Sequence, residues 1–95
     1  MILESAFMTI HQGQATEFLA ALEQAKLVIA EAQGFRGIEV RRGVERPDTF
    51  LLCISWDTLE DHTEGFRGSP LFAAWRGHIG GFFAEPPLVE HWTTA

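Results

Sequence analysis

Residues able to do chemistry are concentrated in one quarter of the chain, residues 56 to 78, which holds two Trp, two Phe, two Arg and two His. His62 and Phe66 are four residues apart, so on a helix they share a face and the imidazole can lie beside an aromatic ligand wall. A histidine with a pKa of about 6.5 accepts a phenolic or enolic proton at neutral pH. A guanidinium from Arg67 or Arg76 could hold the resulting anion. The segment therefore favours acid–base chemistry on a small aromatic molecule.

Each of these residues also has a structural interpretation. A histidine on a short amphipathic helix is often a hydrogen-bonded packing residue, so His62 and His78 stay open between the two roles. His11, at the end of a predicted strand, and His91, which alternates with Glu90 in the last predicted strand, are interpreted as structural or surface residues. Large aromatic side chains dominate core burial, so four of them are expected chiefly in the core, with some also lining a pocket: Trp56, Phe72, Trp75 and Phe82.

The spacing gives little support to other kinds of site. The glycines do not form the strand-to-helix phosphate loop of a nucleotide-binding site. No two histidines are three or four residues apart, so a helical metal pair is absent, and a site of two histidines and one carboxylate would have to assemble from distant residues. Cys53 lies in an apolar predicted strand, where a thiol is typically an inert core group. Ser69 before Pro70 is typical of a helix N-cap rather than of a hydrolase nucleophile.

Composition and charge limit the possible partners. A chain of 95 residues and 10.6 kDa is expected to form one domain, residues 1 to 95. Its 46% hydrophobic and 21% charged residues are typical of a globular protein. Seven basic against thirteen acidic residues give a net charge of -6, which repels phosphate backbones and anionic lipids. We therefore expect neither nucleic acid nor a membrane surface as a partner.

The cellular location is predicted from the single cysteine and from the first residues. One cysteine forms no intramolecular disulfide and no multi-cysteine metal cage, which favours a reducing compartment. The first residues lack the basic start and unbroken apolar run of a signal peptide, because Glu4 interrupts them. No stretch approaches the roughly 20 apolar residues that span a bilayer. A cytoplasmic location is expected.

Hydrophobic periodicity divides the chain into the short elements that must position these side chains. Residues 2–10 alternate as a strand that is apolar on both faces. A helical spacing of apolar residues follows Gly13 and is expected to end at Gly34, in the usual C-terminal capping position. The elements expected after it are strands at 38–41 and 49–56, a short helix at 58–66, a helix from Pro70 with a last turn weakened at Gly80-Gly81, and a strand at 88–92.

This order of elements predicts an α+β fold of the ferredoxin-like, split βαβ kind, with an antiparallel sheet whose helices cover one face. The strand at 49–56 is apolar on both sides, so it is expected to be central and covered on both. Large apolar side chains would remain on the face opposite the helices, and such a patch marks an interface. Burying about 600 Å² of it per chain would contribute on the order of 15 kcal/mol before association costs. A face-to-face homodimer is therefore expected.

Several motifs are together similar to those of a known family. They are the turn Gly34-Phe35-Arg36-Gly37 into a strand, and the run Phe50 to Trp56 followed by His62, Phe66, Ser69-Pro70, Phe72 and Trp75. With them, nearly the whole chain resembles the antibiotic biosynthesis monooxygenase (ABM) domain of the dimeric α+β barrel superfamily. The resemblance implies a homodimer whose sheets form a barrel, with a small apolar pocket between sheet and helices in each subunit. Several members oxidise phenols or quinols with O₂ and no metal or flavin, so no cofactor is expected.

The resemblance also implies roles for individual residues. His62 is the candidate base and Arg67 a partner for the anion, while Trp56, Phe66, Phe72 and Trp75 form the substrate-binding wall, to which we add His78 from the helix that carries Trp75. A deprotonated substrate is electron-rich enough to reduce O₂ itself, so the protein need only bind it, remove a proton and stabilise the anion. The expected function is a cofactor-independent monooxygenase acting on a small aromatic, phenolic or quinol-type metabolite.

Two alternatives stay open. The fold also hosts binding and stress-response proteins, so a dimeric small-ligand binding protein without turnover is the first. Haem-degrading relatives carry an axial histidine at the position nearest Arg76, whereas His78 lies two residues further on and would rotate the ligand by about 200° around the helix. A haem-binding monooxygenase is therefore the lesser alternative. The chain has no tyrosine, so members that bind substrate through a tyrosine are poor guides to this one.

Overall fold

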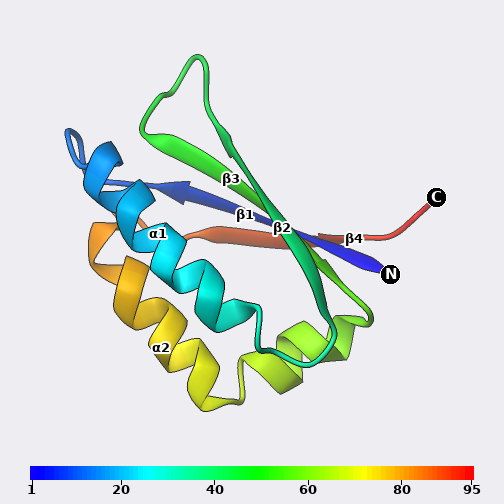
Figure 1. Ribbon diagram of the computed structural model, residues 1–95. Helices are drawn as coiled ribbons and strands as arrows, with labels where there is room; N and C mark the ends of the chain where they lie inside the picture. The colour runs from blue at the N-terminus through cyan, green and yellow to red at the C-terminus, as the bar shows by residue number, and fades with distance from the viewer.

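A computed structural model describes all 95 residues as a four-stranded antiparallel sheet with two helices packed on one face (Figure 1). The strand order across the sheet is β2-β3-β1-β4. The elements are β1 (Ile2–Thr9), α1 (Ala15–Ile29), β2 (Phe35–Arg42), β3 (Thr49–Trp56), the π-helical turn η1 (Asp61–Phe66), α2 (Pro70–Ile79), the 3-10 turn η2 (Gly80–Phe82) and β4 (Leu88–Trp92). This arrangement confirms the predicted α+β, ferredoxin-like fold.

The central strand β1 determines which residues face the helices. It pairs antiparallel with β3 on one side and β4 on the other, so that Ala6 lies opposite both Leu52 and Val89. Because side chains alternate along a strand, residues on even positions of β1 and β3 share the face that the helices cover. Those of β3 are almost fully buried, as the alternation predicts.

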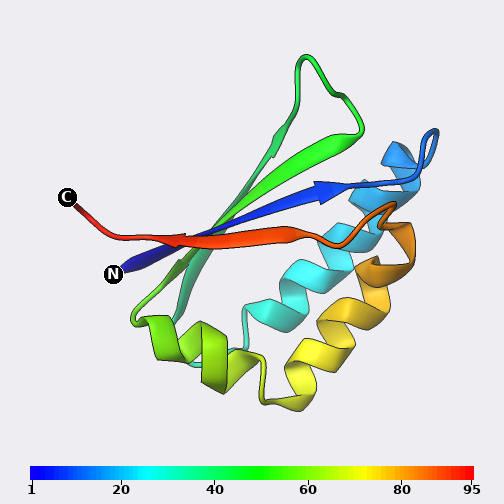
Figure 2. The ribbon, with the colours of Figure 1, turned by 180° about the vertical axis from the view of Figure 1, so that it is seen from behind.

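The hydrophobic core lies between this face and the two helices. The inward stripe of α1 consists of Phe18, Leu22, Ala25 and Ile29, each no more than 1% exposed. The ring of Phe18 packs on that of Phe50 in β3 with 5.0 Å between the centroids. Seen from behind, both helices lie side by side beneath the sheet (Figure 2). No helix combines the length and the apolar character needed to cross a membrane.

Two helix boundaries differ from the sequence-based expectation. The helix α1 ends at Ile29 rather than at Gly34, because the residues between them form hydrogen-bonded turns. Gly34 instead begins the approach to β2 with a φ of 82°, and a side chain there would collide with Asp61. The helix α2 ends at Ile79, where Gly80 starts the 3-10 turn, so the predicted weakening of the last turn takes this form.

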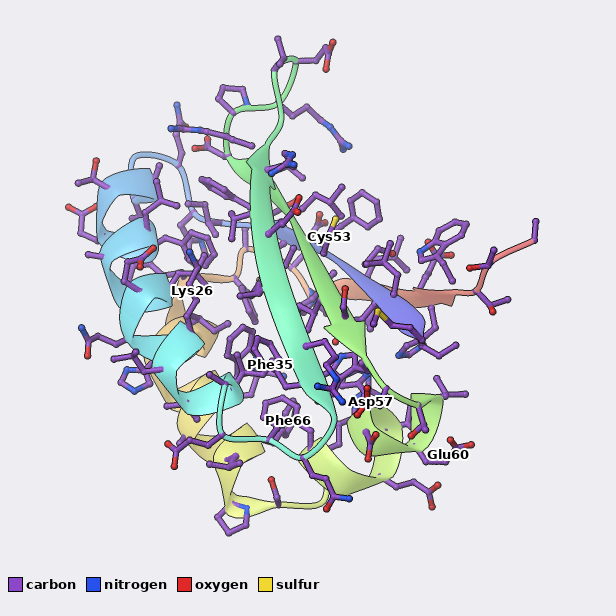
Figure 3. The ribbon with its side chains drawn as sticks, turned by 45° about the vertical axis from the view of Figure 1, so that its right-hand side comes forward. Lys26, Phe35, Cys53, Asp57, Glu60 and Phe66 are labelled. Atoms are coloured by element: carbon purple, nitrogen blue, oxygen red, sulfur yellow. The ribbon has the colours of Figure 1, made fainter.

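The other face of the sheet is open. The strand β3 is covered by its own chain on one side only, not on both as its apolar pattern predicts, because both helices pack on the same face. Leu51 and Cys53 are partly exposed, and Leu3 and Trp92 are 39% and 52% exposed. Figure 3 shows Cys53 pointing away from the helices, whereas Phe66 points beneath the sheet.

Candidate functional site

A cavity of about 630 Å³ lies between the sheet and α2. Ten of its sixteen lining residues are hydrophobic, and they come from both central strands, both helices, η1 and the segment that leads into β4. Small-molecule sites in proteins typically measure about 300 to 1,000 Å³ and are mostly apolar with a few polar groups. The cavity therefore has the size and the lining of a site for a small organic molecule.

Four polar side chains interrupt the apolar lining. Glu4 and His62 are buried, at 5% and 3% exposure, and Arg67 and Arg76 are exposed. Neither arginine forms a salt bridge, although Arg76 lies over the ring of Phe83 at 5.4 Å from its centroid. The cavity thus offers a carboxyl and an imidazole in its wall and two guanidinium groups that are free to meet an anion.

The π-helical turn η1 brings His62 and Phe66 into the interior together. The N–H of Arg67 donates to the carbonyl of His62 at 3.1 Å, which is the i→i+5 bond of a π-helix. Such turns are rare in proteins, and those that occur are often found at functional sites. The imidazole is stacked on the indole of Trp56, with centroids 5.2 Å apart and planes at 22°, and lies 6.3 Å from the Phe66 ring. These two aromatic rings hold the orientation of the imidazole.

Both nitrogens of His62 contact other ionisable groups. Its Nδ1 is hydrogen-bonded to Nε2 of His91 at 2.8 Å, and its Nε2 lies 3.3 Å from Oε1 of Glu4. The same Oε1 accepts a hydrogen bond from the indole Nε1–H of Trp56 at 2.9 Å. Glu4 and His91 are direct partners across the β1–β4 pairing, so the two strands present both side chains to η1. Three distant parts of the chain therefore meet in one buried network.

Burial controls the charge of this network. Burial lowers the pKa of His62 to about 4, and the charge of Arg67 and the neighbouring His91 act in the same direction. Burial raises the pKa of Glu4, against the opposing effects of the Trp56 hydrogen bond and of Arg67. The pKa of His91 is lowered by burial and by Arg67. At neutral pH His62 is therefore uncharged, and its contact with Glu4 is one between an imidazole and a carboxyl rather than an ion pair.

The structure brings together five of the seven residues that the sequence predicts for the site. His62, Phe66, Arg67, Phe72 and Trp75 all line the cavity.

The other two predicted residues, Trp56 and His78, do not line the cavity. Trp56 is fully buried behind His62, where it supports the imidazole and the carboxyl of Glu4. His78 is exposed. At about 100° per residue, His78 lies on one side of the inward residue Trp75, whereas Phe72 and Arg76 lie on the other, where the cavity is. His78 is therefore corrected from a substrate-binding to a surface position.

Two members of the network, Glu4 and His91, are missed by the sequence analysis. Glu4 carries a signal, because it occupies an even position of β1, among the residues that face the core. An acidic residue is almost never fully buried unless it is paired, so its inward position marks it. His91 carries no such signal, because its place beside Glu4 depends on the pairing of β1 with β4, 87 residues apart. The sequence interprets it as a structural or surface residue; it is partly buried and hydrogen-bonded to His62, so it is not a free surface side chain.

The network contains the donor set of a metal site but not its geometry. Two histidines and one carboxylate are the ligands of many non-haem iron sites. Here Glu4 and His91 contact opposite nitrogens of His62, so the three side chains do not converge on one point. No group of three His, Cys, Asp or Glu residues is arranged to hold a metal ion. The three side chains instead lie in a row, with His62 between Glu4 and His91.

Comparison with known proteins finds relatives over most of the chain. Residues 1–77 match the family model described as antibiotic biosynthesis monooxygenase. The chain is 37% identical over 91 residues to the uncharacterized protein YczJ of Bacillus subtilis, covering 96% of each chain.

Solved structures share the fold over almost the whole chain. A proposed antibiotic biosynthesis monooxygenase from Bordetella bronchiseptica superposes with a TM-score of 0.95 at 34% identity, over 99% of this chain and 96% of that one. SnoaB, a cofactor-independent oxygenase from Streptomyces nogalater, superposes with a TM-score of 0.83 over 99% of this chain and 92% of that one. At 13% identity, the second likeness shows the fold alone.

Proposed function

This chain belongs to the antibiotic biosynthesis monooxygenase family, and from that premise we propose that it is a cofactor-independent oxygenase of a small phenolic or quinol-type aromatic molecule. The observation that carries the proposal is an uncharged, buried imidazole beside a carboxyl in the wall of an apolar cavity. An acid–base group of this kind can remove the hydroxyl proton of an aromatic substrate and hold it away from water. SnoaB, which shares the fold, is described as a cofactor-independent oxygenase.

The reaction balances with O₂ as the only oxidant. The acid–base group formed by His62 and Glu4 takes the hydroxyl proton of a phenol, and the phenolate transfers one electron to O₂. The substrate radical and superoxide then combine in a carbon–oxygen bond para to the hydroxyl. The peroxide takes up the stored proton, and loss of the ring proton and of hydroxide gives a quinone and one water. The two substrate hydrogens and one oxygen atom leave as that water.

The remaining cavity residues bind the substrate and stabilise its anion. Phe66, Phe72 and Trp75 provide aromatic walls, and the rings of Phe72 and Trp75 both meet Phe66 edge to face, at 5.5 and 6.2 Å. Arg67 is close enough to influence the pKa of Glu4, His62 and His91, so its charge also favours a phenolate beside them. Binding, proton removal and anion stabilisation are thus assigned to separate side chains.

Proteins of this family are typically dimeric, and the open face of the sheet supports the same assembly for this chain. Leu3 of β1 lies opposite Trp92 of β4, and Phe7 of β1 lies opposite Leu51 of β3 and Leu88 of β4. These apolar side chains are adjacent on a face that no element of the chain covers. A second copy of the chain that packs on this face would leave both cavities separate, one in each subunit.

The function is tested by O₂ consumption and quinone absorbance. Metal-free protein is incubated with a panel of dihydroxynaphthalenes and polyphenols, with and without O₂. We expect O₂-dependent turnover that falls in His62→Ala, because this variant removes the imidazole from the acid–base group. His11→Ala is the matched control, because His11 is exposed and lies outside the cavity. If the wild type consumes no O₂ while the same compounds raise its Tm, the protein binds small ligands without turnover and the proposal fails.

A further inference from the structure

The buried network contains more groups than a single base requires. Glu4 comes from β1, His62 from η1 and His91 from β4, and they are joined by separations of 3.3 and 2.8 Å. Glu4 and His62 are buried and His91 is partly buried, and burying ionisable side chains is costly unless they have polar partners. His62 therefore links the carboxyl of Glu4 to the second imidazole.

The imidazole of His62 is enclosed. It is 3% exposed, one face is stacked on Trp56, and both of its nitrogens have neighbours at the distances above. A substrate hydroxyl that reached Nδ1 would have to break the 2.8 Å hydrogen bond to His91, and one that reached Nε2 would enter its 3.3 Å contact with Glu4. His62, the candidate base, thus lines the cavity but offers a substrate hydroxyl no nitrogen without a neighbour.

The carboxyl of Glu4 is placed differently. Its Oε1 accepts the Trp56 hydrogen bond and lies next to His62 Nε2, while its Oε2 has no hydrogen-bond partner in the protein. No buried side-chain oxygen or nitrogen lacks a partner, so Oε2 keeps an accessible surface, and Glu4 lines the cavity. A substrate hydroxyl in the cavity can approach Oε2 without breaking any contact of the network.

We propose that Glu4 is the catalytic base, that His62 is a positioning residue whose Nε2–H faces Oε1, and that His91 fixes this tautomer by donating its Nε2–H to His62 Nδ1. This assignment rests on the proposed function and names the group that acts. The hydroxyl proton moves from the substrate to Oε2 of the carboxylate, which leaves a phenolate and a neutral carboxylic acid. The same proton returns from Oε2 to the peroxide in the later step, so the network ends as it began.

The surroundings of Glu4 favour this role. His62 from η1, Arg67 directly after it and His91 from β4 are the ionisable groups closest to the carboxyl, Arg76 of α2 lines the same cavity, and α1 contributes only Ile29 there. Burial moves the pKa of the carboxyl upward, towards that of a phenol, which makes it a stronger proton acceptor than a surface glutamate. The Trp56 hydrogen bond and Arg67 keep the carboxylate form accessible.

Turnover distinguishes the base from the positioning residues. We expect Glu4→Gln to lower kcat by about 10² to 10⁴ with little change in KM, and His62→Gln or His91→Gln to lower it by no more than about tenfold. The acidic limb of the pH profile should vanish in Glu4→Gln. It should move to higher pH in His62→Phe, which removes the Nε2–H that faces the carboxylate. A loss in His62→Gln equal to or greater than that in Glu4→Gln would overturn the assignment.

A second measurement does not depend on turnover. A nitrophenol that is bound but not oxidised reports its own ionisation, because the phenolate absorbs at longer wavelength than the phenol. We expect a bound phenolate in the wild type and in His91→Gln, and a bound phenol in Glu4→Gln at the same pH. Ionisation that persists in Glu4→Gln contradicts the proposal even if no oxidisable substrate is found. Turnover that appears only after Fe²⁺ is added, and is lost equally in all three variants, would show a metal site instead.

Discussion

The two faces of the sheet are built from the same strands and differ in what covers them. On the face towards the helices, Leu52 and Ile54 of β3 are no more than 1% exposed, while Leu51 and Cys53, between and beside them, are partly exposed on the other. Both sets are apolar, so hydrophobicity alone does not tell which face the chain covers itself. The difference arises because both helices pack on the same side.

The two faces also depart in opposite ways from the usual pattern of apolar side chains inside and polar side chains outside. The covered face buries a carboxyl and an imidazole, which apolar surroundings disfavour, and the open face exposes Leu3, Leu88 and Trp92, which water disfavours. A buried ionisable group indicates chemistry, and an exposed apolar patch indicates association. The comparison therefore separates the surface proposed to act on a ligand from the surface proposed to meet another copy.

The largest loss of stability is expected when a leucine of β3 on the covered face is shortened, compared with its neighbour on the open face. Leu52→Ala should lower the free energy of unfolding by about 2 to 5 kcal/mol, because it opens a cavity among fully buried side chains. Leu51→Ala, one residue away on the open face, should cost clearly less at low protein concentration. Urea unfolding of both variants measures the difference. If both variants lost the same free energy of unfolding at a concentration where the chain is monomeric, the helices would not cover only one face of the sheet.

A somewhat smaller change in the free energy of unfolding is expected when the pH is lowered, because His62 is buried on the covered face. His62 has a pKa of about 4 in the folded chain, below its ordinary value of 6.5, so the unfolded chain binds more protons over this range. The contribution of the neutral His62 to the free energy of unfolding is fully present above pH 6.5. It is lost as the pH falls towards 4, by about 3 kcal/mol in total. Urea unfolding at several pH values, in the wild type and in His62→Gln, measures it. A variant with the same pH slope as the wild type would show that His62 is not the group responsible.

The smallest change in free energy is expected for dimerisation, when a charge is introduced on the open face. Leu51→Glu should weaken dimerisation at least about tenfold, because it places a carboxylate in the apolar patch. Sedimentation velocity over a range of protein concentrations measures the change. Val44→Glu is the control, because Val44 is 88% exposed in the loop between β2 and β3. A Leu51→Glu protein that stays as dimeric as this control would place the interface elsewhere.

The sequence predicts those parts of the fold that depend on local pattern. The bounds of β3 and β4 and the faces of β1 follow from alternation, and the position of α2 follows from Ser69-Pro70. The end of α1 is wrong, because Gly34 is required by the close approach of η1 and not by the helix. The segment at 58–66 is helical as predicted, yet it forms a π-helical turn, which no propensity indicates.

In the candidate site, too, the sequence predicts contacts between residues near one another in the chain but not contacts made by strand pairing. Aromatic residues near one another in the chain, such as Phe66 and Phe72, are predicted to share a cavity and do so. Trp56 belongs to the same segment, but its fully buried ring supports the network from behind. His91 becomes visible only when β1 and β4 are paired, because the chemistry of a cross-strand neighbour is set by register and not by sequence distance.

The π-helical turn also makes the site sensitive to the length of the chain. Its i→i+5 bond from Arg67 to His62 accommodates one residue more than an α-helical turn does. Removing a residue between His62 and Phe66 would return the segment to ordinary helical spacing and bring a different pair of side chains beneath the sheet. In relatives of this chain, an insertion or deletion at this turn would therefore exchange the side chain that contacts Glu4 in a single evolutionary step, without altering the helices or strands around it.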